Sequence, residues 1–400
     1  MKPLAPFTPV AVTDYTAISA LGQGRAPMLA ALQAGRSGLA QVDFETATIG
    51  TWLGVAPGVD DVVLPPDLAA FDCRNNRLAE LGLRADGFAA SVQAAAQRWG
   101  ASRVGVFLGT STSGILATEV AYRHRDAATG ALPASLHYGE THNTYSVSRY
   151  VRAALGLQGP AYVVSTACSS SAKVFAAAAR MIQAGIVDAA VVGGVDSLCM
   201  TTLYGFKSLE LVSADICRPW DAHRNGLSIG EAAAFALLQR DPQQVQGWLL
   251  GAGETSDGHH MSSPHPEGAG AAAAMRGALA QAGLQPQDVD YLNLHGTGTP
   301  GNDAAEALAV HAVFGGTLPC SSTKGYTGHT LGAAGGLEAA VCLLALQHGF
   351  MPAGLNVTTP DPALHVLYLR EPREQTLRVA ASNSFGFGGS NASLVFGAAA

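Results

Sequence analysis

Short runs of β-branched and other apolar residues recur along the chain, bounded by glycine, proline and polar residues. Five of them have the length and composition of buried strands, and they cover residues 104–108, 162–164, 189–192, 291–294 and 392–396. Alanine-rich stretches of helical length alternate with some of these runs, at residues 171–184, 269–282, 304–313 and 335–348. Alternating strands and helices favour an α/β protein whose sheets are largely buried.

Two parts of the chain repeat a short pattern in the same order. FLGTSTSG (107–114) and NLHGTGTPG (293–301) each place Gly-Thr-x-Thr after the end of an expected strand. The alanine-rich helices that follow end in a similar way, in RMIQAG (180–185) and LLALQHG (343–349). Such a repeat indicates a duplicated βα unit, although an Ala/Gly-rich chain can also produce short matches by chance. We expect two similar halves packed as one body, residues 1–240 and 241–400, with the seam in the polar segment 237–247.

Composition narrows the class of protein. The 400 residues are 48% hydrophobic and carry a net charge of −7. The chain therefore has no overall positive charge that would indicate binding to nucleic acid or to an anionic membrane. The N-terminal segment is a poor signal peptide, and we expect no apolar run of the roughly 18–20 residues that span a bilayer. The six cysteines form no C-x-x-C pair, which fits a reducing compartment. We expect a cytoplasmic protein, in which a local basic patch could still bind an acidic partner.

The segment VVSTACSSSAKVF (163–175) places Cys168 between an expected strand and an expected helix. A thiol there lies near unpaired backbone N–H groups and the positive end of the helix dipole, which favour the nucleophilic thiolate. The alternative is a buried structural cysteine, because free cysteine is among the most buried residue types. The other cysteines that we compared lack this setting and are expected in the core: Cys199, Cys217, Cys320 and Cys342.

Two histidines stand inside glycine- and threonine-rich clusters, where small neighbours let a ligand approach. They are His295 in LNLHGTGTPGND and His329 in STKGYTGHTLGAAGG. The histidines of DGHHMSSPHPEG (257–268) lack regular ligand spacing, so we expect no metal there. The segment SNSFGFGGSNASLVF (382–396) can present backbone N–H groups to a developing oxyanion, or can be only a tight turn before a strand.

Six segments, in order, carry a family resemblance. They are STACSSS (165–171), GGVDS (193–197), RPWDAHRNGLSIGEAA (218–233), HGTGTPGND (295–303), STKGYTGHTLGAAGG (322–336) and SNSFGFGGSNA (382–392). Together they resemble the type I/II β-ketoacyl-acyl-carrier-protein synthases, condensing enzymes of the thiolase superfamily. The resemblance covers the chain from about residue 100 onward; the segment VAVTDYTAISALG departs from the glycine-bearing first strand usual in the family. It implies a thiolase-like duplicated αβαβα layered fold, a homodimer, and no cofactor or metal.

The resemblance also assigns catalytic roles. Cys168 matches the acyl acceptor, and His295 and His329 match the paired active-site histidines, with Lys324 orienting the site. The backbone N–H groups of Cys168 and Phe387 match an oxyanion hole. The implied reaction transfers an acyl group from a carrier protein to Cys168. Malonyl-carrier then loses CO₂ while the two histidines, donating from Nε2, stabilise the enolate, and the carbanion attacks the acyl-cysteine.

Further positions match residues around the substrate. Thr297 and Thr299 match threonines that bind the pantetheine arm, and Phe385 matches a gate phenylalanine. Thr112 falls where the family places a residue that guards the acyl pocket, and Glu338 matches a buried acidic residue near the site.

Carrier proteins are acidic, so a basic patch near the tunnel mouth is expected. Arg74 and Arg77 stand where related enzymes place such residues. Arg123 and Arg125 are a second possibility, and ordinary solvated arginines are the alternative to both.

Other members of the superfamily fit less well. A thiolase would need a second active-site cysteine in a Cys-Gly-Gly loop, where this chain has Phe-Gly-Gly, and starter-type synthases replace the second histidine with asparagine. A chain-length partner subunit without elongation activity normally lacks the nucleophilic cysteine, although a catalytic chain can itself pair with such a partner. Fatty-acid elongation is the common role. Yet Thr112 and the segments FLGTSTSG and FDCRNNRL look more like a specialised bacterial subgroup that includes aryl-polyene and other polyene synthases.

Overall fold

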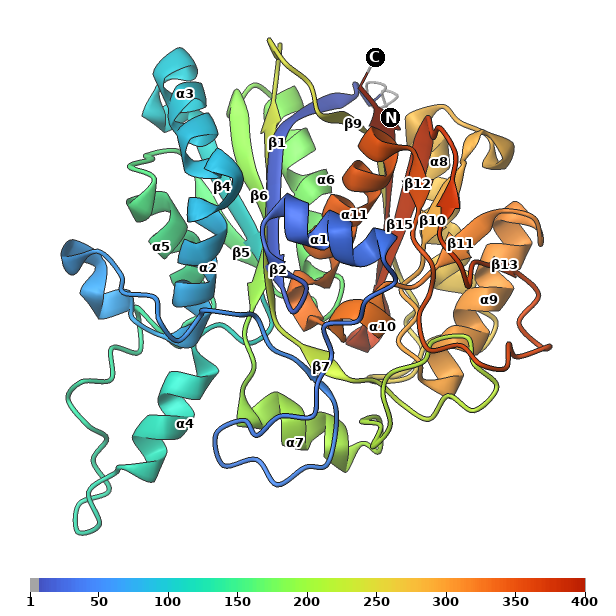
Figure 1. Ribbon diagram of the computed structural model, residues 1–400. Helices are drawn as coiled ribbons and strands as arrows, with labels where there is room; N and C mark the ends of the chain where they lie inside the picture. The colour runs from blue at the N-terminus through green and yellow to red at the C-terminus, as the bar shows by residue number, and fades with distance from the viewer. Residues whose placement is uncertain (1–6, 400) are drawn as a thin grey trace.

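The computed structural model describes residues 7–399, and strands from both ends of the chain meet in its centre (Figure 1). One large sheet contains 12 strands, in the order β13-β11-β10-β15-β16-β9-β1-β8-β6-β4-β5 with β2 paired to β1. Its strands, from one edge to the other, are β13 (Leu367–Tyr368), β11 (Pro319–Ser321), β10 (Tyr291–Asn293), β15 (Val379–Gly386), β16 (Ser390–Ala398), β9 (Gly247–Ser256), β1 (Val10–Ser19), β8 (Ala232–Gln239), β6 (Ala189–Asp196), β4 (Val104–Gly109) and β5 (Ala161–Val164), with β2 at Gly22–Gln23. Two small two-stranded sheets pair β3 (Leu53–Gly54) with β7 (Ile229–Gly230) and β12 (Phe350–Met351) with β14 (Arg373–Glu374).

The strand order repeats on the two sides of the central β1–β9 pair. Outward from β1, the strands β8 and β6 pair antiparallel, and β4 and β5 pair parallel. Outward from β9, the strands β16 and β15 pair antiparallel, and β10 and β11 pair parallel. The similar segments FLGTSTSG and NLHGTGTPG therefore end equivalent strands, β4 and β10. The polar segment 237–247 contains the connection from β8 to β9.

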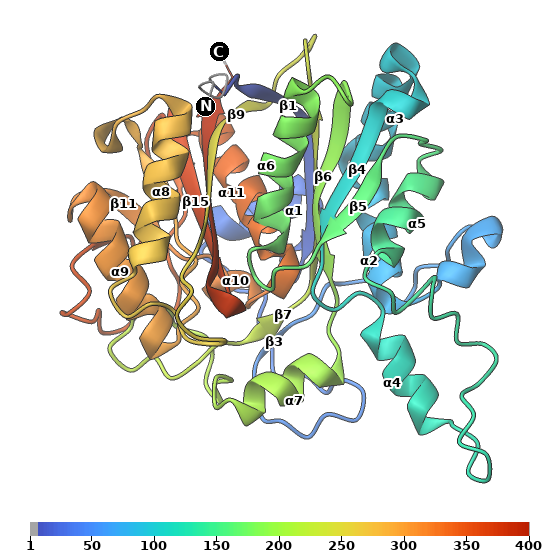
Figure 2. The same cartoon turned by 180° about the vertical axis from the view of Figure 1, so that it is seen from behind.

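Helices form three layers around these two half-sheets (Figures 1 and 2). The central layer is α6 (Ser170–Gln183) and α11 (Ala334–His348), which contact each other and strands of both halves. The outer layer of the first half is α2 (Arg74–Arg84), α3 (Phe88–Trp99) and α5 (Ser146–Ala154). The outer layer of the second half is α8 (Ala269–Ala282) and α9 (Pro300–Phe314). The order α, β, α, β, α is the layered α/β fold expected from the sequence.

The central helix α11 is strongly apolar. The stretch Leu331–His348 has the length and hydropathy of a membrane span, contrary to the expectation that no such run exists, but 89% of it is buried inside the protein. Burial on all sides explains the composition, because a helix between two sheets has no solvent-facing stripe.

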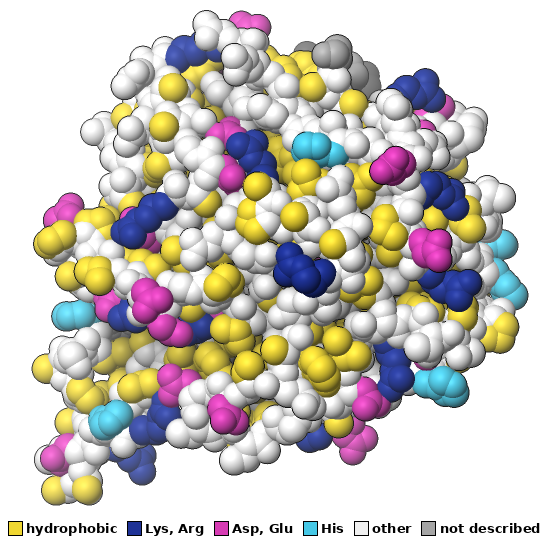
Figure 3. Space-filling view, viewed as in Figure 1, with side chains coloured by type: hydrophobic (Ala, Val, Ile, Leu, Met, Phe, Trp, Pro, Cys, Tyr) yellow, Lys and Arg dark blue, Asp and Glu magenta, His cyan; other side chains and the backbone are white. Residues whose placement is uncertain are grey.

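The remaining helices lie at the periphery or near the site. They are α1 (Arg25–Gln33), α4 (Ile115–Arg123), α7 (Met200–Ser208) and α10 (Lys324–Thr327). Figures 1 and 2 both show α4 and the segment that follows it reaching away from the layered body. Acidic and basic side chains are interspersed over the face drawn in Figure 3, without a large field of one sign.

Candidate active site

The candidate nucleophile, Cys168, lies in the turn between β5 and α6, two residues before the helix begins. Its predecessor Ala167 has φ 51°, a left-handed backbone that is uncommon for a residue with a side chain. The Ser170 hydroxyl donates to the Ala167 carbonyl at 2.5 Å and accepts the Thr166 N–H at 2.9 Å. These short polar residues hold the strained turn and present the thiol at the end of the helix.

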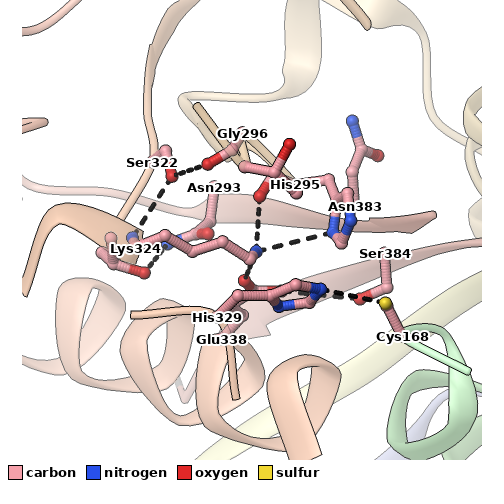
Figure 4. A network of polar contacts seen from close by, with 12 residues as sticks. Cys168, Asn293, His295, Gly296, Ser322, Lys324, His329, Glu338, Asn383 and Ser384 are labelled. Atoms are coloured by element: carbon pink, nitrogen blue, oxygen red, sulfur yellow. Dashed lines mark hydrogen bonds and ion pairs between the residues drawn. The ribbon is translucent and has the colours of Figure 1, made fainter. Parts of the chain in front are cut away.

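His329 is the nearest polar partner of this thiol. Its Nε2 lies 2.9 Å from the Cys168 sulfur (Figure 4). Its backbone is hydrogen-bonded to β7 and the residue before it: the His329 N–H donates to the Ser228 carbonyl at 2.8 Å, and the Gly230 N–H donates to the His329 carbonyl at 3.0 Å. The ring of His295 is nearly perpendicular to that of His329, with 5.3 Å between centroids. One side-chain N or S atom from each of Cys168, His295 and His329 lies within 4.8 Å of the others, and all three residues are buried.

Lys324 and Glu338 form a buried ion pair behind the histidines, and each side chain is at most 3% exposed. The ammonium donates to a Glu338 carboxylate oxygen and to the His295 carbonyl, and it lies 3.5 Å from the His295 Nδ1 (Figure 4). Burial, and after it the Lys324 charge, hold the pKa of His295 and His329 well below the usual value. Both imidazoles are therefore neutral at physiological pH.

The surroundings also decide which ring nitrogen carries hydrogen. Lys324 offers only N–H donors, so the His295 Nδ1 that faces it acts as an acceptor and the hydrogen resides on Nε2. The His329 Nδ1 has no hydrogen-bond partner among residues 7–399. A buried N–H without an acceptor is rarer in proteins than an under-satisfied acceptor, which places the His329 hydrogen on Nε2 as well. The two rings thus offer two Nε2–H donors.

A cysteine and two histidines at this separation could in principle hold a metal ion. Metal-bound histidine, however, almost always donates the hydrogen of its other nitrogen to an acceptor. Here that nitrogen faces an ammonium in His295 and has no described partner in His329. The arrangement fits hydrogen bonding to an anionic oxygen or sulfur and does not fit a cation.

Burial dominates the electrostatics of the nucleophile. It raises the pKa of the Cys168 thiol to about 12, against the lowering effects of the Lys324 charge and the Phe387 backbone N–H. A backbone N–H group thus favours the thiolate, as the sequence led us to expect, but burial outweighs its effect on the pKa. Two N–H donors, from His329 and Phe387, nevertheless converge on the sulfur.

The glycine-rich segment between β15 and β16 brings the Phe387 N–H to this position. A Cβ on Gly386 would lie 2.6 Å from the Thr166 carbonyl oxygen, so only glycine lets the two backbones approach this closely. Two contacts hold the far side of the segment: the Gly388 N–H donates to the Met261 carbonyl at 2.7 Å, and the Phe387 ring stacks on Phe206 with centroids 5.4 Å apart.

A cavity of about 450 Å³ opens onto the three reactive side chains. Its lining includes Cys168, His295, His329, Thr297, Thr299, Phe385 and Phe387. The hydroxyls of Thr297 and Thr299 lie 2.8 Å apart, each able to turn toward a ligand. The wall nearer solvent comes from α7, the start of α9 and the loop before α8.

Not every residue expected at the site lines the cavity. Thr112 does not line this cavity, because its hydroxyl donates to the carboxylate of Asp196 at 2.9 Å. Lys324 and Glu338 do not line it either, and they act from behind the histidines.

The structure does not support Arg74 as part of the expected basic docking patch. Its side chain is 9% exposed and pairs with the buried Glu231 at 2.6 Å and with Asp60 at 2.6 Å, so it is not free to meet a partner. Arg77 makes two 2.6 Å hydrogen bonds to Asp72. Of the second pair, Arg123 binds Glu45 at 2.9 Å, while Arg125 is exposed.

Two buried carboxylates near the site were not identified from the sequence. Glu306 accepts the N–H groups of His295 at 2.8 Å and Gly296 at 2.7 Å, and so fixes the histidine-bearing turn. Burial raises the pKa of Glu306 to about 7. Asp196, inside the segment GGVDS, accepts hydrogen bonds from the turn after β4. The only available signal was an acidic residue embedded among glycines and apolar residues, where an ionisable side chain needs partners.

Comparison with known proteins agrees with this geometry. The family descriptions "Beta-ketoacyl synthase, N-terminal domain" and "Beta-ketoacyl synthase, C-terminal domain" match residues 85–244 and 246–358. The mitochondrial 3-oxoacyl-[acyl-carrier-protein] synthase of Arabidopsis thaliana is 41% identical over 62% of this chain, an alignment that spans only 59% of the plant protein. The 3-oxoacyl-[acyl-carrier-protein] synthase 2 of Coxiella burnetii is 32% identical over 96% of this chain and 97% of its own length.

A solved structure resembles the whole chain. The match is to one chain of a solved complex between the ketosynthase ApeO and its chain length factor ApeC, from Xenorhabdus doucetiae. The TM-score is 0.88, the identity is 38%, and the alignment covers 100% of both chains. Coverage of this extent means that the similarity includes both halves of the fold.

Proposed function

Because this chain belongs to the β-ketoacyl synthase family, the condensing enzymes of fatty-acid and polyketide elongation, we propose how it performs that reaction. Cys168 holds an acyl group, which condenses with malonyl-acyl-carrier protein as CO₂ leaves, to give a β-ketoacyl-carrier product. The observation that most directly supports this proposal is the 2.9 Å contact between the Cys168 sulfur and the His329 Nε2. Both residues line a cavity that His295 also lines.

The first step is acyl transfer. The Cys168 thiol releases its proton to solvent, and the thiolate attacks the thioester carbonyl of an acyl-carrier. The carbon–sulfur bond to the carrier then breaks, and the departing pantetheine thiolate takes a proton from solvent. The backbone N–H groups of Cys168 and Phe387 receive the developing oxyanion. Attack requires a thiolate although the resting thiol has a pKa of about 12, and the Nε2–H of His329 supplies a donor that stabilises the anion as it forms.

The second step uses the two histidines as donors. A malonyl thioester places its carbonyl oxygen against the Nε2–H groups of His295 and His329, and these stabilise the enolate as CO₂ departs. The enolate carbon then attacks the acyl carbonyl, and the Cys168 thiolate leaves and takes a proton from solvent. The lowered pKa values of the two rings suit this role, because neither ring has to change its protonation state.

We assign the outer cavity to the pantetheine arm. Thr297 and Thr299 offer it hydroxyl groups, and Phe385, beside His295 with centroids 5.7 Å apart, forms a gate next to the reacting carbons. The carrier protein then docks at the solvent end of the cavity. Lys207 is exposed there, directly after the cavity residue Phe206, and replaces Arg74 as the basic contact that we propose for an acidic carrier.

The partner chain is proposed to pair along β5. This strand is an edge of the large sheet, and its residues Ala161–Val164 are apolar yet only partly buried. A second copy would make a homodimer. A chain length factor would make a heterodimer, which the similarity to a ketosynthase solved with such a factor favours as a second possibility. Size-exclusion chromatography with light scattering, alone and with the co-expressed factor, distinguishes the two.

The substrate class is proposed to be polyene or aryl-primed chains rather than saturated fatty acyl chains. The support is the resemblance of Thr112 and the segments FLGTSTSG and FDCRNNRL to a specialised bacterial subgroup that includes aryl-polyene and other polyene synthases. Intact-mass spectrometry after incubation with saturated, unsaturated and aryl-primed acyl-carriers tests it: preferential loading of an unsaturated or aryl-primed group is expected. Preferential loading of saturated chains would overturn the substrate class and leave the condensing function intact.

The same experiment tests the alternative of a chain-length partner without its own elongation activity. A mass gain that disappears in Cys168→Ala and discharges as an extended product on adding malonyl-carrier supports condensation. Absence of any loading would favour the partner subunit.

We also propose that the halves 1–240 and 241–400 divide the site, the first supplying the nucleophile and the second the histidines and the glycine-rich segment. Cytoplasmic location is proposed from the six unpaired cysteines, all within the described residues.

A further inference from the structure

The segment GGVDS ends in a buried aspartate that the mechanism does not use. Asp196 closes strand β6, and its carboxylate is fully buried. Burying an unpaired carboxylate costs free energy, so the hydrogen bonds that compensate this cost indicate which segments the carboxylate holds in place.

Five donors surround this carboxylate. Four belong to the turn after β4: the Thr110 hydroxyl at 2.6 Å, the Ser111 N–H at 2.8 Å, and the Thr112 N–H and hydroxyl at 2.9 Å each. The fifth is the Gly332 N–H at 2.5 Å, which lies in the other half of the fold, three residues after His329.

Each bound segment leads directly to one member of the reactive pair. Ser111 donates its hydroxyl to the Ala167 carbonyl at 3.3 Å, and Ala167 precedes Cys168. On the other side, the chain from His329 to Gly332 passes through Leu331, whose φ of 51° equals that of Ala167. Two left-handed turns thus flank the carboxylate, one before Cys168 and one after His329, and each needs surrounding contacts to persist.

The atoms around the Asp196 carboxylate are closely packed. A Cβ on Gly332 would lie 2.7 Å from an Asp196 carboxylate oxygen and 2.7 Å from the Ser111 hydroxyl. The two central helices also touch here, since the Gly336 N–H donates to the Ser171 hydroxyl at 2.8 Å. A change at the carboxylate is therefore transmitted to the relative position of the two turns.

We propose that Asp196 is a positioning residue that sets the contact between Cys168 and His329 by binding the turns that carry them. It touches neither substrate nor reacting atoms. The inference rests on the proposed pairing of Cys168 with His329, and its test measures that contact without requiring condensation.

The experiment is a double-mutant cycle on the rate of Cys168 alkylation by iodoacetamide, read by intact mass at fixed pH. Asp196→Asn keeps the volume but replaces one acceptor oxygen with an NH₂ donor facing backbone N–H groups. Loss of a residue that orients a metal ligand costs roughly 10–100-fold in activity, and by analogy we expect the alkylation rate to fall by at least about 10-fold. His329→Ala should lower the rate by itself, and Asp196→Asn should add little in the His329→Ala background, because both act on one contact.

Two further variants keep the test independent of folding. Asp188→Asn makes the same substitution just before the opposite end of β6, where Asp188 binds Arg103 and Arg240 away from the cavity, and it should leave the alkylation rate unchanged. Asp196→Glu retains the carboxylate and should recover part of the rate.

An unchanged rate in Asp196→Asn would overturn the proposal, as would a loss equal to that of Asp188→Asn at matched thermal stability. A loss fully additive to His329→Ala would do the same. Failure of His329→Ala itself to lower the rate would instead count against the proposed Cys168–His329 function.

Discussion

The buried pair between Lys324 and Glu338 gives the sharpest test of how the site is held together. Replacing Lys324 with methionine removes the ammonium and leaves the Glu338 carboxyl buried opposite an apolar side chain. Both side chains are at most 3% exposed, so water cannot replace the lost partner. Breaking a buried pair on one side costs roughly 3–5 kcal/mol, and replacing both partners by neutral groups costs much less.

We therefore expect Lys324→Met to lower the free energy of unfolding by about 3–5 kcal/mol in urea titrations at pH 8. The double variant Lys324→Met/Glu338→Gln should recover most of that loss. Arg103→Met removes a partly exposed ion pair with Asp188 and serves as the control, with a much smaller expected loss. A loss below about 1 kcal/mol for Lys324→Met, or a double variant as unstable as the sum of the two single variants, would refute the reasoning.

Lys324→Met should also change the pH dependence of the decarboxylation reaction. The Lys324 charge contributes to the lowered pKa of His295 and His329, so its removal should raise both values. Because the neutral imidazoles are the donors in the proposed mechanism, the acid limb of malonyl-carrier decarboxylation should move to higher pH in Lys324→Met. An acid limb that stays in place or moves to lower pH would contradict the assignment of Lys324 as the charge that keeps the rings neutral.

Three other predictions concern the surrounding segments. Gly386→Ala should slow acyl transfer to the nucleophile and destabilise the fold by about 1–3 kcal/mol, because its Cβ would lie 2.6 Å from a backbone carbonyl oxygen. Gly50→Ala is the control, because its Cβ meets nothing within 4 Å and Gly50 does not line the cavity; equal effects of the two substitutions in acylation and urea assays would contradict the geometry. Burial raises the pKa of Glu306 to about 7, so between about pH 4.5 and 7 the folded state keeps a proton that the unfolded state has released. The stability that Glu306 contributes should therefore be lost as pH rises from about 4.5 through 7. Glu306→Gln should flatten that part of the Tm-versus-pH profile, and a profile as steep as the wild type's would exclude Glu306 as its source. Lys207→Glu should raise the KM for acyl-carrier protein while leaving the KM for a small pantetheine thioester unchanged, and Arg77→Glu should affect neither; the reverse pattern in steady-state kinetics would restore the docking patch first expected from the sequence.

The sequence predicted those elements whose pattern matches their environment. Strand β4 lies where a β-branched run predicted it, and helix α11 begins within one residue of the expected start. Helix α9 begins earlier than expected, at Pro300, because a proline fits the first turn of a helix, where no N–H partner is needed. Strand β8 was not identified, because its sequence AAAFALLQ is rich in alanine and leucine, which favour helices; pairing with β1 and β6 overrides that preference.

The site was predictable as a set of residues and not as an electrostatic environment. The segments around Cys168, His295 and His329 identified the groups that meet in the cavity. The pKa of Cys168 depends on burial by segments from both halves of the chain, which local sequence does not report. The same holds for Arg74: the family resemblance suggested a basic docking residue, whereas Glu231, more than 150 residues away, binds it in the interior.

The duplication explains why the reactive groups meet where they do. Helices α6 and α11 occupy equivalent places in the two halves, each following a left-handed turn, at Ala167 and Leu331. Since the two helices contact each other in the central layer, their N-terminal turns are brought to one point between the half-sheets. One turn presents the thiol just after its left-handed residue, and the histidine that faces it lies two residues before the left-handed residue of the other turn, so the nucleophile and its donor come from neighbouring positions of two equivalent turns. A substitution that separates the two helix starts should therefore weaken the Cys168–His329 contact even when it lies in neither turn, and the buried carboxylate of Asp196, bonded to both halves, is where that separation is resisted.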